Sequence, residues 1–255
     1  MDAVLHLAAI VGDPACGQNP DLTRAVNYDA SVQLFEQCVH NNVEKFVFAS
    51  TCSNYGKMAD SSSYATETSE LRPVSFYAES KVAVEKKLLA EPVDGGPIVT
   101  VLRFATLLGL SQRMRFDLTV NEFTSELLIK RKLMVYGQQF WRPYVHVRDA
   151  ARAIALVLES PQEFVCGQVF NAGDTTQNYN KEGLVELISG EIDGDVQIEY
   201  VHNDEDPRDY RVSFDKINQQ LGFQITRTVK DGVREIVNAI DRGVITDIDN
   251  PIYRN

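Results

Sequence analysis

The stretch KFVFAS, residues 45–50, decides the fold class, because two similar apolar runs lie before and after it. These runs are AVLHLA at residues 3–8 and IVTVLR at residues 98–103. Each has the length and composition of a strand that is buried on both faces of a sheet. Helical segments are predicted between them, at about 20–39 and 76–91. This alternation predicts right-handed βαβ units and a parallel sheet, which is an α/β fold.

The second half of the chain does not continue this regular alternation. We expect helices at about 117–130, 148–160, 180–189, 214–221 and 229–242, and short strands at 133–136, 144–147, 168–171 and 197–201. Their irregular order predicts a mixed α+β region beside the parallel sheet.

The charge balance argues against two classes of partner. The 255 residues include 25 Lys and Arg against 36 Asp and Glu, which gives a net charge of −11. Nucleic-acid-binding proteins normally carry a basic surface, and anionic membranes attract basic segments. We therefore expect neither nucleic acid nor a membrane as a partner. An anionic small ligand stays compatible with this charge, because a pocket can be locally basic in an acidic protein.

The cysteine usage is typical of a reducing compartment. Cys16, Cys38, Cys52 and Cys166 stand far apart and form no C-x-x-C pair, so a disulfide framework is not expected. The longest apolar stretch, residues 3–11, is too short to span a bilayer. The first residues also lack the basic region of a signal peptide. We expect a cytoplasmic protein, and no metal site is predicted.

Polar residues follow the predicted strands at the end of the sheet where α/β proteins bind their substrates, in segments 50–56, 77–81 and 103–109. Tyr77 and Lys81 are four residues apart on a predicted helix, so their side chains share one face. A nearby ammonium lowers the pKa of a tyrosine, which can then exchange a proton with a substrate hydroxyl or carbonyl. The spacing is also common on helix surfaces, so this motif alone decides nothing.

A series of stretches along the chain follows the order of one enzyme family. They are VLHLAA (4–9), AVNYDAS (25–31), KFVFASTCSNYG (45–56), YAESK (77–81), LRFATLLG (102–109), RPYVHVRDAARAI (142–154), VFNAGD (169–174) and PRDYRVSFDKINQQLGF (207–223). Together they resemble the extended short-chain dehydrogenases/reductases, the NAD-dependent nucleotide-sugar epimerases and dehydratases. The resemblance implies a Rossmann-like parallel sheet with a smaller α+β substrate-binding domain. It assigns residues 1–110 and 143–172 to the first domain and residues 111–142 and 173–255 to the second.

The resemblance also implies site residues. Tyr77 matches the catalytic acid/base, Lys81 matches the lysine that holds the nicotinamide ribose, and Thr51 matches the hydroxyl that binds the sugar oxygen. Further contacts to the cofactor, NAD or NADP, are implied for Leu7, Ala8, Ala9, Asn27, Ser50 and Phe104. Contacts to the nucleotide sugar are implied for Thr51, Cys52, Ser53, Thr106, Asn121, Met134 and Tyr136 (both at the base), Arg142 and Arg208 (both at the diphosphate).

Three positions depart from particular branches of the family. Cys52 and Ser53 stand where 4,6-dehydratases carry an Asp-Glu pair, which argues against a standard dehydratase. Thr106 stands where many 4-epimerases have an asparagine. The cysteine of the two-base 3,5-epimerases lies one position after Cys52. Two interpretations of Cys52 stay open: a thiol close to the sugar, or a small buried residue at a strand end.

The family's phosphate-binding turn is not found in the sequence. Family members begin with a strand, a G-x-x-G-x-x-G turn and a helix, whose N–H groups hold the cofactor pyrophosphate. Aligned on the family, residues 3–8 form the fourth strand, so roughly 60 residues are lacking and this strand is expected to be a bare apolar edge. Either the chain is a fragment of an enzyme, or it is a shortened homologue that no longer binds a dinucleotide. The retained Thr51, Tyr77 and Lys81 favour a fragment.

The function expected from this resemblance is hydride transfer at a sugar carbon by an NAD(P)-dependent nucleotide-sugar epimerase or oxidoreductase, with Tyr77 as acid/base. A nucleotide-sugar 4-ketoreductase is one alternative, and a reductase of steroid- or flavonoid-like carbonyls is another. Arg142 favours a phosphorylated substrate over the latter. A non-catalytic, cofactor-deficient interaction or regulatory protein is the third alternative. The expected partners are the nucleotide sugar and a second copy in a homodimer.

Overall fold

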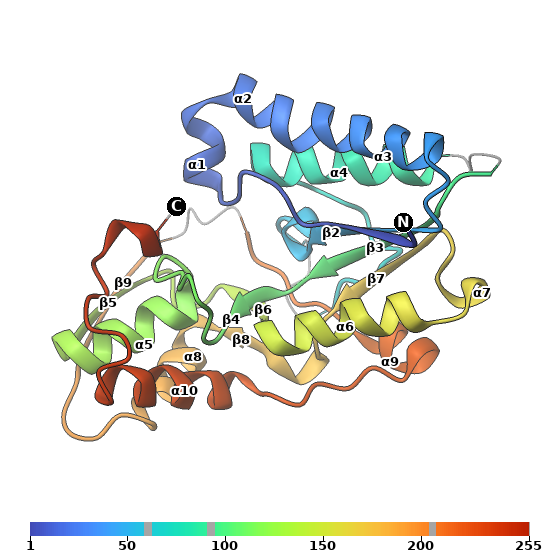
Figure 1. Cartoon of the computed structure of the whole chain (residues 1–255). Coiled ribbons are helices and arrows are strands. Elements are labelled where there is room, and N and C mark those ends of the chain that lie inside the picture. The colour runs from blue at the N-terminus through green and yellow to red at the C-terminus, as the bar shows by residue number, and fades with distance from the viewer. Residues whose placement is uncertain (59–62, 91–94, 204–207, 255) are drawn as a thin grey trace.

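The computed structural model describes residues 1–58, 63–90, 95–203 and 208–254. The acidic run 204–206, expected from its charge to be a solvated turn, lies outside these residues. Figure 1 shows two groups of elements side by side, which we call the N-terminal and the C-terminal lobe. The N-terminal lobe comprises the main sheet with the helices on its two faces. The C-terminal lobe comprises two smaller sheets and the helices packed on them.

The main sheet confirms the predicted parallel α/β arrangement. Its strands are β1 (Ala3–His6), β2 (Lys45–Thr51), β3 (Ile98–Phe104) and β7 (Gln168–Ala172). They lie in the order β1-β2-β3-β7, and all of their pairings are parallel. The carboxyl ends of the first three strands therefore meet at one edge of the sheet.

Helices cover both faces of the main sheet. Figure 1 shows α3 (Ala30–His40) and α4 (Phe76–Leu89) above the sheet and α6 (Val147–Glu159) below it. Phe46 and Phe48 of β2 belong to the apolar cluster under α3 and α4, whereas Val47 belongs to the cluster on the opposite face. This alternation arises because successive side chains of a strand point to opposite faces. It explains why residues 46–49 of KFVFAS are all apolar.

The segment between β1 and β2 is less regular than the single helix predicted for residues 20–39. It consists of α1 (Asp13–Gln18), α2 (Pro20–Arg24), a π-helical turn (Ala25–Asp29) and then α3. Asn27 lies in the π-helical turn and is buried. Its side chain accepts from the N–H of Ile10 (2.8 Å) and donates to the carbonyl of Ile10 (2.9 Å). The π-helical turn therefore directs the side-chain amide of Asn27 toward the loop that follows β1.

The C-terminal lobe is the mixed α+β region that the sequence predicts. Its sheets are β4-β6-β8 and β5-β9. The elements are β4 (Thr106–Leu108), α5 (Thr119–Lys130), β5 (Lys132–Tyr136), β6 (Trp141–His146), β8 (Asn178–Asn180), α8 (Lys181–Ser189), β9 (Gln197–Val201) and α10 (Val229–Asp241). The short helix α7 (Gln162–Val165) follows α6, and α9 (Asp215–Leu221) lies between β9 and α10 in the sequence. The sequence did not predict α1, α7, β4 or β8, which have at most six residues each and so too few for a periodic pattern.

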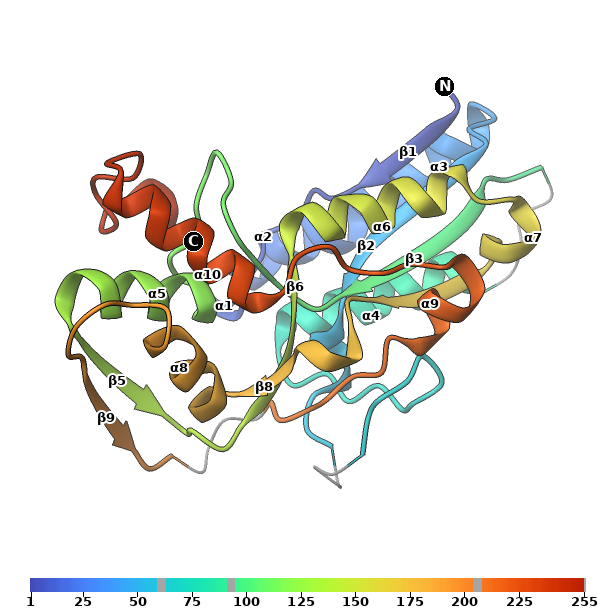
Figure 2. The same cartoon turned by 90° about the horizontal axis from the view of Figure 1, so that it is seen from below.

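Strand β1 differs from the expectation that it is buried on both faces. It pairs only with β2 among the described strands, and Leu5 and Leu7 are 36% and 55% exposed. Figure 2 shows β1 at the margin of the sheet. The apolar edge expected from the family alignment is therefore present in this structure.

No helix of the described residues is long and apolar enough to cross a bilayer.

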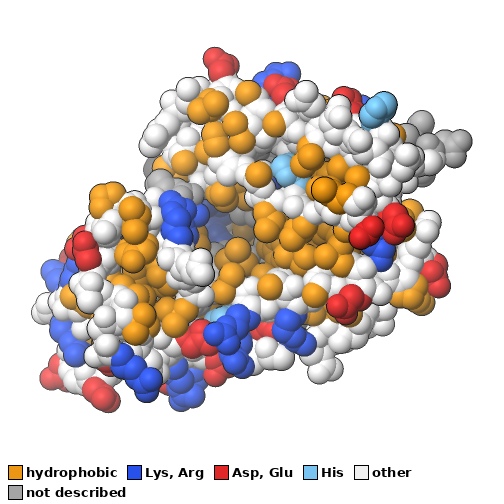
Figure 3. Space-filling model, in the orientation of Figure 1, with side chains coloured by type: hydrophobic (Ala, Val, Ile, Leu, Met, Phe, Trp, Pro, Cys, Tyr) orange, Lys and Arg blue, Asp and Glu red, His pale blue; other side chains and the backbone are white. Residues whose placement is uncertain are grey.

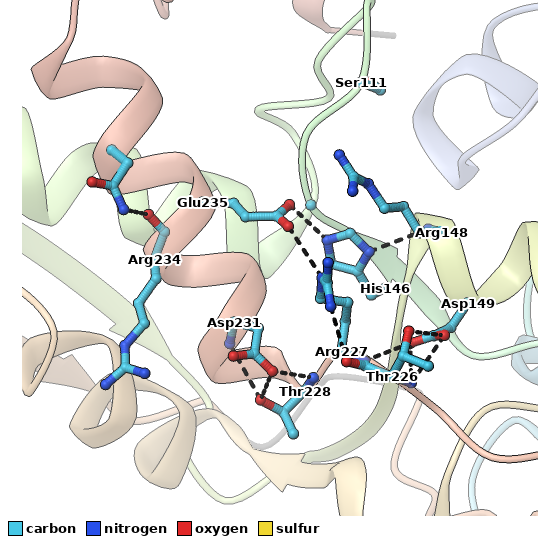
Figure 4. Close-up of polar contacts among 12 residues, drawn as sticks. Ser111, His146, Arg148, Asp149, Thr226, Arg227, Thr228, Asp231, Arg234 and Glu235 are labelled. Atoms are coloured by element: carbon cyan, nitrogen blue, oxygen red, sulfur yellow. Dashed lines mark hydrogen bonds and ion pairs between the residues drawn. The ribbon is translucent and has the colours of Figure 1, made fainter.

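A polar cluster ties the start of α6 to α10 (Figure 4). His146 accepts from the N–H of Arg148 through Nδ1 (3.2 Å), so its proton lies on Nε2, which donates to Glu235 of α10 (2.9 Å). The fully buried Asp149 accepts from the N–H groups of Thr226 (2.9 Å) and Arg227 (2.8 Å). These contacts fix the segment before α10 against the helix that covers the main sheet, and so they hold the two lobes together.

Candidate functional site

The two predicted catalytic residues lie at the start of α4, beside the carboxyl ends of the main strands. Ser75 caps this helix by accepting from the N–H of Ala78 (3.3 Å). Tyr77 and Lys81 lie on the helix face turned to the sheet. The Nζ of Lys81 donates to the carbonyl of Ala49 (2.8 Å) and lies 5.9 Å from the ring centroid of Tyr77. The structure therefore places ammonium and phenol side by side, as their spacing predicts.

Burial shifts the titration of both groups. It lowers the pKa of Lys81 to about 8, and the charge of Glu85 partly opposes this shift. Burial also raises the pKa of Tyr77, as do the nearby Cys16 and Asp13, whereas Arg115 lowers it. The expectation that Lys81 gives Tyr77 a lowered pKa is therefore wrong for this structure, because loss of hydration of the phenolate dominates.

We expect the Lys81 ammonium to titrate near pH 8, below the ordinary range of a lysine. The measurement is the Cε chemical shift of Lys81 in carbon-labelled protein, followed by NMR and assigned with Lys81→Arg. Exposed Lys86, on the same helix, serves as the internal control. A Lys81 signal that titrates together with that of Lys86 would contradict the burial argument.

The end of β2 presents two hydroxyls to the same region. Thr51 accepts from the N–H of Ser53 (3.1 Å) and is half-buried. The hydroxyl of Ser53 bonds to the phenol of Tyr210, with 3.3 Å between the oxygens. Tyr210 lies in the segment before α9, so this bond joins β2 to a distant part of the chain. Sequence reasoning placed this tyrosine within the matching stretch 207–223 but gave it no role.

Two arginines stand next to Tyr210. The Cζ of Arg142 lies 5.3 Å from the ring centroid of Tyr210, and its NH1 donates to the main-chain carbonyl of Arg208. Arg208 forms an ion pair with Asp13 at the start of α1, with 3.0 Å between NH1 and Oδ2. Figure 3 shows a hollow between the two lobes with apolar side chains inside and Lys and Arg side chains at its margin. A planar guanidinium at such a place suits a phosphate or carboxylate ligand.

The chain is similar in sequence to known proteins. A family model described as the NAD dependent epimerase/dehydratase family matches residues 1–173. The chain belongs to this family. It is 30% identical to the uncharacterized UDP-glucose epimerase YtcB of Bacillus subtilis, over 74% of this chain and 59% of that protein. It is 29% identical to dTDP-glucose 4,6-dehydratase of Streptomyces griseus, over 92% of this chain and 70% of that protein.

Solved structures support the same fold. The UDP-glucose 4-epimerase of Thermotoga maritima with UDP-glucose has a TM-score of 0.84 and 25% identity, covering 95% of this chain and 78% of its own. MoeE5 in complex with UDP-glucuronic acid and NAD has a TM-score of 0.81 and 25% identity, covering 95% of this chain and 80% of its own. The Rossmann-like parallel sheet expected from the resemblance is thus confirmed. The chain spans about 59% of the length of the first relative named above.

Several polar residues expected at the site of this family member are engaged elsewhere. The hydroxyl of Ser50 donates to Glu85 in a buried network, and the thiol of Cys52 donates to the carbonyl of Arg103 (3.2 Å). Burial raises the pKa of this thiol far above its ordinary value. The expectation that the Cys52 side chain contacts the sugar is therefore corrected: the thiol lies in the apolar core, as the alternative interpretation holds. Asn121 is likewise engaged, since it accepts from the N–H of Gly109 (3.2 Å).

The remaining expected contacts range from exposed to buried. Met134 and Tyr136 line a cavity of about 770 Å³ between α5 and β5, with three lysines and two glutamates around it. Leu7 and Ala8 are exposed directly after β1, while Ala9, Phe104 and Thr106 are half-buried. Asn27 holds the loop that carries Leu7 to Ile10, so its role in the described residues is to shape that loop. The two residues that the sequence did not predict for the site are Asp13 and Tyr210.

Proposed function

We propose that the chain is an NAD(P)-dependent nucleotide-sugar epimerase or oxidoreductase that transfers hydride at a sugar carbon. One observation carries this proposal: Tyr77 and Lys81 lie at the same edge of the sheet as Thr51, and Arg142 and Arg208 lie nearby. The family and the relatives named above support it, because their printed names describe enzymes that act on UDP- and dTDP-sugars. A phosphorylated substrate also suits Arg142 and Arg208 better than a neutral steroid- or flavonoid-like carbonyl would.

The residues fit the nicotinamide ribose half of a dinucleotide. Lys81 offers a buried ammonium beside Tyr77, and exposed Leu7 and Ala8 form an apolar surface at the end of β1. When bound, NAD or NADP accepts hydride from the sugar carbon and can return it. The N–H-rich glycine turn that holds a pyrophosphate is not present in residues 1–255. We propose that Phe104 and Ser50 border the nicotinamide ribose half as well, because they lie at the ends of their strands.

The chain's own residues transfer the proton and bind the sugar, the diphosphate and the base. Tyr77 takes the proton from the sugar hydroxyl as hydride leaves, and Lys81 stabilises the phenolate that must form in this step. Thr51, held by the N–H of Ser53, can donate its hydroxyl to the same sugar oxygen. We assign the diphosphate to the two arginines, and the base to the cavity lined by Met134 and Tyr136. Thr106, Asn121 and Ser53 would border the sugar.

The assembly and location are part of the proposal. We propose a homodimer through α2 and α4, which is supported by Leu22 and Phe76, exposed by 50% and 37%. A cytoplasmic location is supported by four cysteines without a disulfide partner among them. We keep residues 1–110 and 143–172 as the cofactor domain and residues 111–142 and 173–255 as the substrate domain. Helix α9 falls in the second range, although its Ile217 packs in the apolar cluster of the main sheet.

The experiment that tests this function is a screen of UDP-, dTDP-, GDP- and CDP-sugars with added NAD or NADP, carried out on the chain extended at its N-terminus by a family-type strand, turn and helix. An epimerase yields the second sugar at constant absorbance of reduced nicotinamide, whereas a ketoreductase consumes NADPH and yields an alcohol. Products are identified by NMR of the sugar, and Tyr77→Phe is the matched inactive control. If no sugar nucleotide is turned over while several still bind, the chain is a non-catalytic binding protein.

Cofactor affinity is a separate measurement. We expect residues 1–255 to bind NADH weakly, because the sequence supplies no glycine-rich turn to hold the pyrophosphate. Titration by nicotinamide fluorescence tests this, beside a version of the chain extended at its N-terminus by a family-type strand, turn and helix. Tight binding by the 255-residue chain would contradict the expectation and would show that other residues hold the pyrophosphate.

A further inference from the structure

An ion pair joins the two lobes at the mouth of the site. Asp13 is the first residue of α1 in the N-terminal lobe, and Arg208 lies in the segment that precedes α9. The side chains of Arg208 and Asp13 are 37% and 33% exposed, so water and solutes reach the pair.

The pair lies between the acid/base and the arginine cluster. The main-chain carbonyl of Arg208 accepts from Arg142, so both guanidinium groups belong to one cluster. Asp13 is also close enough to Tyr77 for its charge to raise the pKa of the phenol. The backbone beside Asp13 is close to a third arginine, because a Cβ at Gly12 would lie 4.0 Å from NH2 of Arg115. Arg115 itself is paired with Asp117 (2.6 Å), so Arg208 is the guanidinium that the Asp13 carboxylate contacts directly.

We propose that Asp13 is an internal counter-ion of Arg208 that the substrate diphosphate replaces. This inference rests on the proposed function. A guanidinium fork binds a carboxylate and a phosphate with the same donors, so the two anions compete for it. A partly exposed ion pair contributes little free energy, so a doubly charged ligand displaces the carboxylate easily. A singly charged or neutral ligand gains too little binding free energy from Arg208 to displace the carboxylate. Asp13 thereby selects for the diphosphate.

The test is the affinity of purified protein for a free nucleoside diphosphate, measured by calorimetry. UDP, dTDP, GDP and CDP are compared first, and the one that binds most tightly is the probe. We expect Asp13→Asn to bind this probe about fivefold more tightly, since the competing charge is gone while the side chain keeps its shape. Glu36→Gln, which neutralises an exposed acid on α3, is the matched control and should bind like the wild type.

A double-mutant cycle identifies Arg208 as the partner. Arg208→Met should weaken binding of the probe, and adding Asp13→Asn to it should bring no further change. If Asp13→Asn leaves the affinity unchanged or lowers it, the carboxylate does not compete with the diphosphate and the inference is wrong. If the wild type binds the probe but Arg208→Met does not weaken binding, the inference fails while the proposed function stands. If the wild type binds none of the four diphosphates, both fail.

Discussion

Glu85→Ala is expected to lower the free energy of unfolding by about 3–5 kcal/mol, because it leaves a buried guanidinium without its counter-charge. Glu85 of α4 and Arg103 of β3 have side chains that are 3% and 5% exposed. The NH2 of Arg103 lies 2.6 Å from Oε2 of Glu85, and its Nε is 3.1 Å from both carboxylate oxygens. The same carboxylate accepts from Ser50 and Asn54. One substitution therefore breaks the network that fixes α4 to two strands.

Urea denaturation followed by circular dichroism measures this effect. Glu79→Ala, an exposed acid on the same helix, is the matched control and should change stability by less than about 0.5 kcal/mol. Replacing both partners, as in Glu85→Leu with Arg103→Met, should recover most of the loss, because no charge is then left unpaired in the interior. A loss for Glu85→Ala no larger than about 1 kcal/mol, the value of an exposed pair, would contradict the buried network.

The parallel sheet and the juxtaposition of Tyr77 with Lys81 could be predicted because both depend on local pattern. Three apolar runs separated by helical segments admit few arrangements, and these follow from right-handed connections. The spacing of Tyr77 and Lys81 fixes a shared helix face whatever surrounds it. Glu85, a further four residues along, shares this face as well. The spacing of Glu85 indicates that it lies on the buried face of α4. Its partner Arg103, however, lies in β3 and could be found only from the fold.

The directions of polar side chains at the strand ends could not be predicted. Ser50 and Cys52 flank Thr51, yet the Ser50 hydroxyl turns into the buried network and the Cys52 thiol turns into the core. Ser50 points away from Thr51 because successive strand side chains alternate, whereas Cys52 already belongs to the turn of 3-10 helix that follows β2. Contacts between the lobes could not be predicted from the sequence for a different reason. The ion pair of Asp13 with Arg208 and the bond of Ser53 with Tyr210 join residues more than 150 positions apart. Such pairs depend on how the lobes pack.

Tyr77→Phe is expected to lower kcat by about 10²- to 10⁴-fold, the contribution of a positioned acid/base, once a nucleotide-sugar substrate is known. The change removes the phenol oxygen that we propose accepts the sugar proton, and it keeps the ring in its packing. Because burial raises the pKa of Tyr77, the phenolate is scarce near neutral pH. Turnover should therefore rise with pH until Lys81 loses its proton near pH 8 and no longer stabilises the phenolate.

Steady-state kinetics and calorimetry together test this role. Substrate affinity should stay within about twofold in Tyr77→Phe, because the arginines and the base cavity are untouched. Tyr136→Phe is the matched control: it removes a phenol from an exposed tyrosine of the base cavity, and it should leave the pH profile of kcat unaltered. A Tyr77→Phe protein that keeps more than a tenth of the wild-type kcat would show that another group moves the proton. A loss of affinity with unchanged kcat would place Tyr77 in binding, because only an interaction made in the transition state changes kcat.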